Sequence, residues 1–237
     1  MVKLFCMPWA GGASYCYNFW NSTDEIEVIP IEYSGHGKRF GEKLSYEFTD
    51  LIHDCLMQIV SGEEDDVCLF GHSMGALAAF ECAHALSAGN RKPKHLFVSG
   101  MCAPDCWEKN CTPVKEDKDI VEHIKRLDGI PQELLENHQI LDIFVPMIKA
   151  DYLALGTYRY SHPRPLSLPV TVFSGTLDEQ MYKDRKGWTG ETGEACTFYE
   201  YQGGHFFIKD SFEDIMNRII SQLKGKKRLE PDERICY

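Results

Sequence analysis

The chain has 237 residues, a formal net charge of −11 and 43% hydrophobic residues. This length suits one domain with a well-buried α/β core rather than two independent domains. An acidic chain argues against binding to nucleic acid, which requires a basic surface. No apolar stretch approaches the length needed to span a bilayer.

Ten cysteines are present, but a disulfide framework is expected only in a small exported protein. Pro8 and the glycines after it interrupt the apolar N-terminus too early for a signal peptide, so we predict a cytoplasmic protein. Several cysteines fall on apolar faces of predicted elements and are expected to be reduced core residues, namely Cys6, Cys55, Cys68 and Cys82.

The first predicted element is a short strand over residues 2–6, followed at once by Pro8-Trp9-Ala10-Gly11-Gly12-Ala13-Ser14. A glycine-rich turn after an early strand can present a backbone N–H to an oxyanion. The alternative is a simple turn before a helix that Ser14 caps.

A second strand is predicted over residues 26–31, and the loop after it contains Ser34-Gly35-His36-Gly37. A core-facing helix is then predicted over residues 48–60, because apolar side chains recur there at helical spacing.

The pentapeptide Gly71-His72-Ser73-Met74-Gly75 lies between an apolar run, residues 67–70, and an alanine-rich helical stretch. A serine on a sharp strand-to-helix turn is held clear of its neighbours, and only small residues two positions to either side permit that turn. We therefore predict that Ser73 is a nucleophile. The N-terminus of the next helix would face an oxyanion formed there, with the Met74 N–H as one donor.

After a strand predicted over residues 95–99, the segment from about 103 to 166 is too long for one connection. It has helical stretches of its own around residues 120–127 and 133–155, and we interpret it as a lid inserted over the site. Cys102, Cys106 and Cys111 lie near its start, but they lack the paired spacing typical of a metal site.

The predicted lid contains more apolar residues than two solvent-facing helices need. They can simply pack the lid onto the body, or part of this surface can line an acyl channel. In the second interpretation the channel is lined by Phe144 and Met147, with Phe206 and Met74 near its floor.

Two later strands each end in a candidate catalytic residue. The run 170–173 leads to Asp178, and the alternating run 197–201 leads through Gly203-Gly204 to His205. An imidazole can accept the proton of a serine hydroxyl and return it, and a carboxylate can hold the ring in the correct tautomer. His36 is a weaker candidate for the base, because only His205 follows the late strand that the order Ser, Asp, His requires.

Strands alternate with helices along the whole chain, which predicts a largely parallel sheet with helices on both faces and right-handed crossovers. A last core-facing helix contains Phe212, Ile215 and Leu223, and Ser211 with Asp214 is expected to cap it. We predict a single α/β-hydrolase domain over 1–237, with a loose C-terminal tail from about residue 225.

Taken together, these motifs resemble those of the type II thioesterases, the discrete editing enzymes that accompany nonribosomal peptide and polyketide synthases. The resemblance runs from about residue 3 to residue 223 and rests on Pro8-Trp9-Ala10-Gly11-Gly12, Gly35-His36-Gly37, Gly71-His72-Ser73-Met74-Gly75, Ala150-Asp151-Tyr152-Leu153-Ala154-Leu155, Gly175 with Asp178, and Gly203-Gly204-His205-Phe206-Phe207. Two positions depart from the family pattern: Ser34 stands where proline is frequent, and Trp9 is an unusual residue before Ala10.

The resemblance implies a triad of Ser73, Asp178 and His205, oxyanion donors at the N–H groups of Ala10 and Met74, and no metal or cofactor. The implied substrate is an acyl, aminoacyl or peptidyl thioester on the phosphopantetheine arm of a carrier protein. We expect substrate contacts from Trp9, Phe144, Met147 and Phe206, and a monomer.

Three alternatives remain open, because a fold and a triad do not select the substrate. They are a medium-chain fatty-acyl thioesterase, a small-molecule carboxylesterase and a binding protein without catalytic activity. A further question is charge. Carrier proteins are commonly acidic, so steering toward this chain would need local basic clusters such as Arg91-Lys92-Pro93-Lys94 or residues 224–228.

Overall fold

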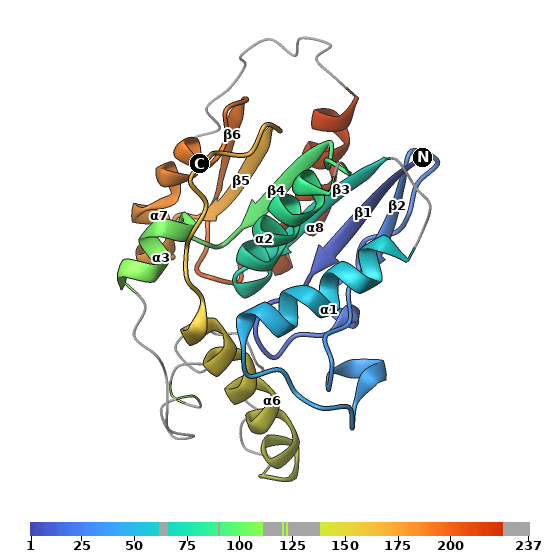
Figure 1. Ribbon diagram of the computed structural model, residues 1–237, viewed down its shortest axis with the longest axis vertical. Coiled ribbons are helices and arrows are strands. Elements are labelled where there is room, and N and C mark those ends of the chain that lie inside the picture. Colours follow the sequence, from blue (N-terminus) through green and yellow to red (C-terminus); the bar gives the residue numbers. More distant parts are fainter. Residues whose placement is uncertain (62–65, 90, 111–119, 121, 123–137, 225–237) are drawn as a thin grey trace.

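The computed structural model describes residues 1–61, 66–89, 91–110, 120, 122 and 138–224. Its six described strands are β1 (Val2–Met7), β2 (Ile26–Pro30), β3 (Val67–His72), β4 (His95–Ser99), β5 (Val170–Gly175) and β6 (Cys196–Tyr201). They form one sheet in the order β2-β1-β3-β4-β5-β6, and every neighbouring pair is parallel (Figure 1). The predicted α/β-hydrolase architecture is confirmed, and each predicted strand is present.

Helices cover both faces of the sheet (Figure 1). One face packs against α1 (Phe48–Val60) and α2 (Met74–Ala88), and the other packs against α8 (Ile208–Leu223) and the short 3₁₀ helix η1 (Ser14–Tyr17). Because both faces are buried, the central strands are almost continuously apolar, as is usual for parallel sheets. Leu69, Val98 and Val172 point to the first face, whereas Phe70, Phe97 and Phe173 point to the second.

The remaining described elements are shorter helices and one long helix in the connections between strands. They are α3 (Pro104–Asn110), α6 (His138–Thr157), α7 (Glu179–Lys183) and the 3₁₀ helices η2 (Gly37–Arg39) and η3 (Arg185–Glu191). Figure 1 shows α6 at the end of the molecule toward which the strands point. The predicted lid helix around residues 120–127 and the predicted C-terminal tail lie largely or wholly outside the described residues.

One predicted helix start is wrong. Ser211 and Asp214 do not cap α8, because the helix begins three residues earlier at Ile208. The turn after the Gly203-Gly204 bend continues directly into the helix through hydrogen bonds from the Phe207 N–H to the Gly204 carbonyl and from the Lys209 N–H to the Phe206 carbonyl. Asp214 instead accepts a hydrogen bond from the Tyr201 hydroxyl at 2.7 Å.

The four cysteines expected in the core are buried there as free thiols. Cys102 is buried and Cys106 is half-buried, whereas Cys111 lies outside the described residues. Burial raises the pKa of the Cys102 thiol to about 12. In the described part of the chain, no group of three or more His, Cys, Asp or Glu side chains could hold a metal ion, and no helix is both long and apolar enough to cross a membrane.

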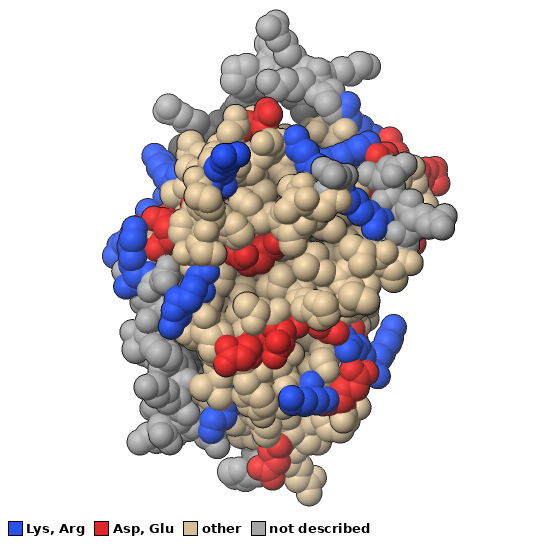
Figure 2. Space-filling view, viewed as in Figure 1, with Lys and Arg blue, Asp and Glu red and all other residues tan. Residues whose placement is uncertain are grey.

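On the face shown in Figure 2, acidic and basic side chains lie interspersed. In the basic cluster Arg91-Lys92-Pro93-Lys94, Lys94 forms an ion pair with Asp66 at 2.6 Å. Lys224, which begins the other cluster, pairs with Glu25 at 2.9 Å, and residues 225–228 lie outside the described chain. At least two of these cations are therefore partly neutralised within the molecule.

Candidate active site

Ser73 occupies a sharp turn between β3 and α2. Its φ of 56° and ψ of −124° make it the one non-glycine residue with a positive φ in the described chain. Such a conformation costs of order 1–3 kcal/mol and persists only where the surroundings enforce it. His72 and Met74 on either side are buried, whereas Ser73 is partly exposed. The turn thus exposes the Ser73 hydroxyl and buries the side chains of His72 and Met74.

Close backbone packing enforces this turn. A Cβ atom on Gly71 would overlap the Gly75 carbonyl, and a Cβ atom on Gly75 would overlap the carbonyl of Met7 at the end of β1. Only glycine fits at either position, since backbone atoms have no room to move aside. The same packing brings the N-terminus of α2 against the segment that follows β1.

We expect Gly75→Ala to destabilise the protein by about 3 kcal/mol or more, because its new methyl group would meet two backbone carbonyls. Gly89→Ala, at the other end of α2, is the matched control, since its Cβ would lie 3.6 Å from the nearest atoms. Urea denaturation of the two variants measures the difference. Equal stability losses would contradict this account of the elbow.

His205 lies between Ser73 and Asp178. Its Nε2 is 2.9 Å from the Ser73 Oγ, and its Nδ1 is 2.6 Å from the Asp178 Oδ2. A carboxylate only accepts, so the Nδ1–H donates to Asp178, and Nε2 is left as the acceptor for the serine hydroxyl. The histidine and aspartate side chains are only 7% and 9% exposed.

Two loops at the carboxyl edge of the sheet bring these side chains together. Asp178 follows β5 and directly precedes α7, and His205 follows β6 after the Gly203-Gly204 bend. The loops bind each other, because the Leu177 N–H donates to the Gly203 carbonyl at 2.8 Å. This placement agrees with the rule that open α/β sheets hold their active sites at the carboxyl ends of their strands.

The other two candidate histidines do not approach the Ser73 hydroxyl as hydrogen-bond partners. His72 is buried, with its Nδ1 2.9 Å from the Ser99 hydroxyl. Burial, followed by the nearby His205, lowers its pKa well below the usual value, so the ring is neutral. His36 instead contacts Asp151, with 3.0 Å between its Nε2 and Oδ2.

The glycine-rich segment after β1 forms a tight turn beside the elbow. The Gly12 N–H donates to the Trp9 carbonyl at 2.8 Å, which places Ala10 and Gly11 at the tip of the turn. Within the described residues, no protein group accepts a hydrogen bond from the N–H of Ala10 or of Met74. Unpaired donors of this kind are what an oxyanion hole requires. Ser14 begins η1 but makes no capping hydrogen bond.

Of the four expected substrate-contact residues, Phe206 lies next to His205, and Trp9 lies against Phe206. The ring of Phe206 lies 5.1 Å from the ring of His205 and 5.2 Å from that of Trp9, measured between centroids. Met147 is buried on α6, and Phe144 is half-buried against Ile148 and Ile120. Met74, expected near the channel floor, has its side chain in the core between the sheet and α2. The channel itself stays a prediction.

Asp151 contributes to this region although the sequence assigned it no role. It lies on α6, and its Oδ2 accepts hydrogen bonds from the Gly11 N–H at 2.6 Å and from His36. One signal for it is present in the sequence, namely a single carboxylate within the apolar stretch Ala150-Asp151-Tyr152-Leu153-Ala154-Leu155. Such a group is rarely buried without a specific partner.

Comparison with known proteins agrees with this geometry. The chain is 29% identical over 228 residues to the gramicidin S biosynthesis protein GrsT of Aneurinibacillus migulanus, covering 94% of this chain and 89% of that protein. It is 30% identical over 234 residues to the medium-chain S-acyl fatty acid synthase thioesterase of Rattus norvegicus, covering 94% and 88%. The structure of ClbQ from the colibactin NRPS/PKS pathway is similar with a TM-score of 0.86 and 28% identity, covering 94% of this chain and 97% of ClbQ.

A family model also matches nearly the whole chain. Residues 2–223 match the thioesterase domain, a range that includes Ser73, Asp178 and His205. The chain therefore belongs to the thioesterase family and is a serine hydrolase that acts on thioesters.

Proposed function

We propose that Ser73, His205 and Asp178 are the catalytic triad of this thioesterase, and that the N–H groups of Ala10 and Met74 form its oxyanion hole. The observation that carries the proposal is the continuous pair of contacts from the Ser73 Oγ through the His205 ring to Asp178, at 2.9 and 2.6 Å. Separations of this size permit proton transfer between a nucleophile and its base.

The first stage forms an acyl-enzyme. The Ser73 oxygen attacks the thioester carbonyl carbon while His205 takes the hydroxyl proton, and the two N–H groups stabilise the oxyanion. The carbon–sulfur bond then breaks, and His205 returns the proton to the departing thiolate. Asp178 stabilises the imidazolium that exists between these two transfers.

The second stage releases the acid. His205 takes a proton from water, whose oxygen attacks the ester carbonyl of the acyl-enzyme through the same oxyanion hole. The ester bond breaks, the Ser73 oxygen recovers its proton from His205, and the carboxylic acid leaves. The scheme uses only side chains and backbone groups of this chain.

The proposed substrate is an acyl, aminoacyl or peptidyl group carried as a thioester on the phosphopantetheine arm of a carrier protein. Support comes from ClbQ of the colibactin NRPS/PKS pathway and from GrsT, whose name places it in gramicidin S biosynthesis. Every residue of the proposed site comes from the same chain, which is consistent with a monomer. The free, buried cysteines suit a reducing compartment, which we take to be the cytoplasm.

The decisive experiment measures the mass added to Ser73 after exposure to carrier proteins loaded with different acyl chains. We expect an adduct equal to the acyl group, located on Ser73 and cleared over time as the acid appears. An adduct on another residue would contradict the assignment of the nucleophile. Acyl transfer from coenzyme A but not from carrier proteins would contradict the proposed substrate.

One alternative substrate has a specific observation in its favour. The rat relative, at 30% identity, is a medium-chain fatty acid synthase thioesterase. Because the same triad serves both substrates, we propose comparing kcat/KM for medium-chain acyl groups on a fatty-acid-type carrier with that for aminoacyl and short acyl groups on a peptide-type carrier. A strong preference for the former would establish the alternative.

We further propose that Trp9 and Phe206 contact the acyl group near the triad, and that Phe144 and Met147 contact its distal part from α6. Enlarging the side chain at either α6 position, in Phe144→Trp or Met147→Phe, should lower kcat/KM for long acyl chains about tenfold more than for short ones. The matched control is Ile143→Trp, because Ile143 is exposed on the same helix. Unchanged chain-length selectivity in both test variants would argue against the channel.

A further inference from the structure

The turn that carries Ala10 has a defined type. Its Gly12 N–H bonds to the Trp9 carbonyl, Gly11 has a φ of 74°, and Ala10 is not among the residues with positive φ. This combination identifies a type II turn, in which the third residue needs a positive φ and is therefore usually glycine. The central N–H of the turn, on Gly11, donates to the Asp151 carboxylate at 2.6 Å.

Asp151 reaches this turn from α6, 140 residues away in sequence. It is only 2% exposed, so its charge must be compensated by partners inside the protein. The same oxygen, Oδ2, faces the Nε2 of His36 at 3.0 Å. The buried carboxylate is thus bound by a peptide N–H on one side and by an imidazole on the other.

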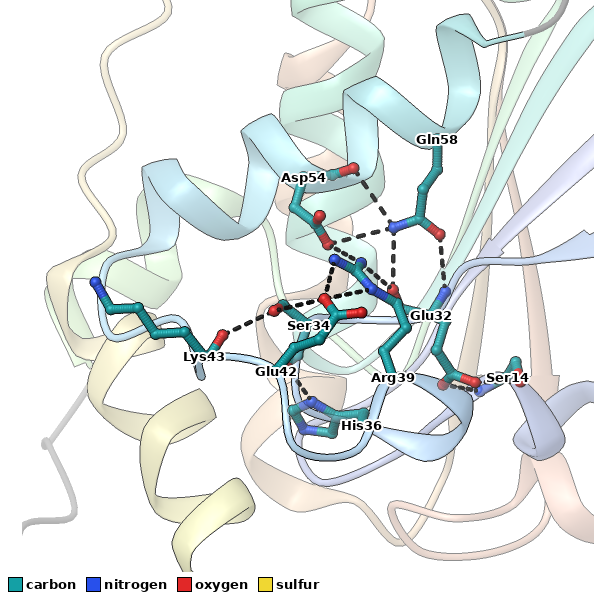
Figure 3. A network of polar contacts seen from close by, with 9 residues as sticks. All are labelled: Ser14, Glu32, Ser34, His36, Arg39, Glu42, Lys43, Asp54 and Gln58. Carbon is teal, nitrogen blue, oxygen red and sulfur yellow. Dashed lines mark hydrogen bonds and ion pairs between the residues drawn. The ribbon is translucent and has the colours of Figure 1, made fainter.

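His36 is held as an imidazolium by its surroundings. Its Nδ1 lies 3.0 Å from the Ser34 carbonyl oxygen, and its Nε2 faces the Asp151 carboxylate (Figure 3 shows the Ser34 contact). Neither partner can donate a hydrogen bond, so both ring nitrogens must carry a proton. Burial alone would lower the pKa of His36, but the hydrogen bond to Asp151, its charge, the Ser34 carbonyl and Glu32 together raise it.

Other groups around His36 are consistent with its positive charge. Glu32, at the end of β2, contributes a second nearby carboxylate, and the Tyr33 ring lies 5.8 Å away, edge to face. The Tyr33 hydroxyl stays neutral, because burial raises its pKa well above the usual value, and it donates to the Pro8 carbonyl at 2.8 Å. Glu32 itself binds the Ser14 N–H at 2.8 Å and the Ser14 hydroxyl at 2.7 Å (Figure 3).

We propose that Asp151, oriented by His36, is a positioning residue that fixes the oxyanion turn and couples it to α6. A type I turn would direct the Ala10 carbonyl, in place of the Gly11 N–H, toward the carboxylate, and the two acceptors would repel each other. Asp151 therefore selects the type II form. The Ile148 side chain also packs directly against the Gly11 Cα, so α6 contacts the turn twice.

This inference rests on the proposed role of the Ala10 N–H, and the coupling has a direct consequence for α6. A movement of α6 away from the sheet edge would withdraw both Asp151 and Ile148 from Gly11. The oxyanion turn would then lose the group that fixes its central peptide. Efficient attack on the thioester therefore requires α6 to be seated against residues 9–12.

The first test is Asp151→Asn, which keeps the size of the side chain and removes its charge. We expect kcat to fall about 10- to 100-fold with KM nearly unchanged, because the donor is misplaced rather than lost. Glu191→Gln is the matched control, a buried carboxylate on η3 that accepts a hydrogen bond from the Tyr160 hydroxyl at 2.9 Å instead of from the turn. We expect it to lower thermal stability and to change kcat less than about threefold.

The second test follows pH and does not depend on whether Asp151→Asn folds. A general base must be neutral to accept a proton, so the acidic side of the pH profile reports the base and the alkaline side tests His36. The ion pair of His36 is complete below the ordinary pKa of histidine and is lost as pH rises through the raised pKa of the folded protein. The wild type should therefore lose kcat again on the alkaline side.

His36→Gln should abolish this alkaline decrease, because a glutamine amide can donate to Asp151 at every pH. The inference would be overturned if the wild type showed no alkaline decrease in kcat, or if the decrease persisted in His36→Gln. Equal losses of kcat in Asp151→Asn and Glu191→Gln would also overturn it. Ser73→Ala, assayed alongside, separates a failure of the proposed triad from a failure of the positioning role. Turnover by Ser73→Ala refutes the triad. An inactive Ser73→Ala together with wild-type kcat in Asp151→Asn refutes only the positioning role.

Discussion

Ser73→Ala should lower kcat by about a million-fold, since removal of the nucleophile leaves only binding and the oxyanion hole to act on the thioester. The fold should be retained, because among the described residues the Ser73 side chain bonds only to His205, while backbone hydrogen bonds to Ser99 and Ala76 hold the turn. Hydrolysis of an acylated carrier protein and covalent labelling by a serine-directed phosphonate measure the effect.

Ser87→Ala is a suitable control for this experiment. Ser87 lies on α2, which begins directly after Ser73, and its hydroxyl donates to the Ala83 carbonyl within the helix. It should keep wild-type turnover and phosphonate labelling. Substantial hydrolysis by purified Ser73→Ala would show that another group is the nucleophile.

Asp178→Asn should lower kcat by about ten-thousand-fold with little change in structure. The Asp178 carboxylate accepts from the His205 Nδ1 at 2.6 Å, whereas an amide in its place can turn its NH₂ group toward the ring and favour the wrong tautomer. Steady-state kinetics at several pH values measures this loss. Glu179→Gln removes the same charge from the adjacent, exposed residue and should leave kcat nearly unchanged.

If Glu179→Gln reduced kcat as strongly as Asp178→Asn, the effect would reflect the local electrostatic field rather than the tautomer. Retention of full activity in Asp178→Asn would show that another group orients His205.

The sheet, and the meeting of the three side chains that we propose as the triad, could be predicted from the sequence because their signals are local. Each predicted strand is an apolar or alternating run, and each proposed catalytic residue follows one of these runs at the carboxyl edge. The sharp turn at Ser73 could be predicted in the same way, because backbone contacts at that turn require glycine at positions 71 and 75. The pattern of residues thus determined where Ser73, Asp178 and His205 would meet.

The contact between Asp151 and Gly11 could not be predicted in the same way. It joins residues that are 140 positions apart in the sequence. Its geometry depends on how α6 packs against the turn, which no local pattern encodes. His36 was considered as a base because it is a histidine in a loop near the sheet edge. Its actual partner is a buried carboxylate, whose position depends on tertiary structure alone.

The prediction for the start of α8 was wrong for a different reason. Ser211 and Asp214 match the sequence pattern of a helix cap, but the bend at Gly203-Gly204 already directs the chain into helical geometry. Tertiary context then decided the boundary, as it often does for helix ends. The proposed substrate channel has no local signal either, because its proposed lining, such as Trp9 and Met147, comes from separate segments.

The sequence separation of the triad has a consequence for synthesis. Ser73 and His205 are 132 residues apart, and the histidine follows the last strand of the sheet. Ser73 therefore leaves the ribosome before His205 is synthesised. Without that histidine, the Ser73 hydroxyl of the nascent chain is an ordinary, weakly nucleophilic alcohol. Under the proposed mechanism, hydrolysis requires β6 to have joined the sheet, so the appearance of activity during refolding reports completion of the sheet.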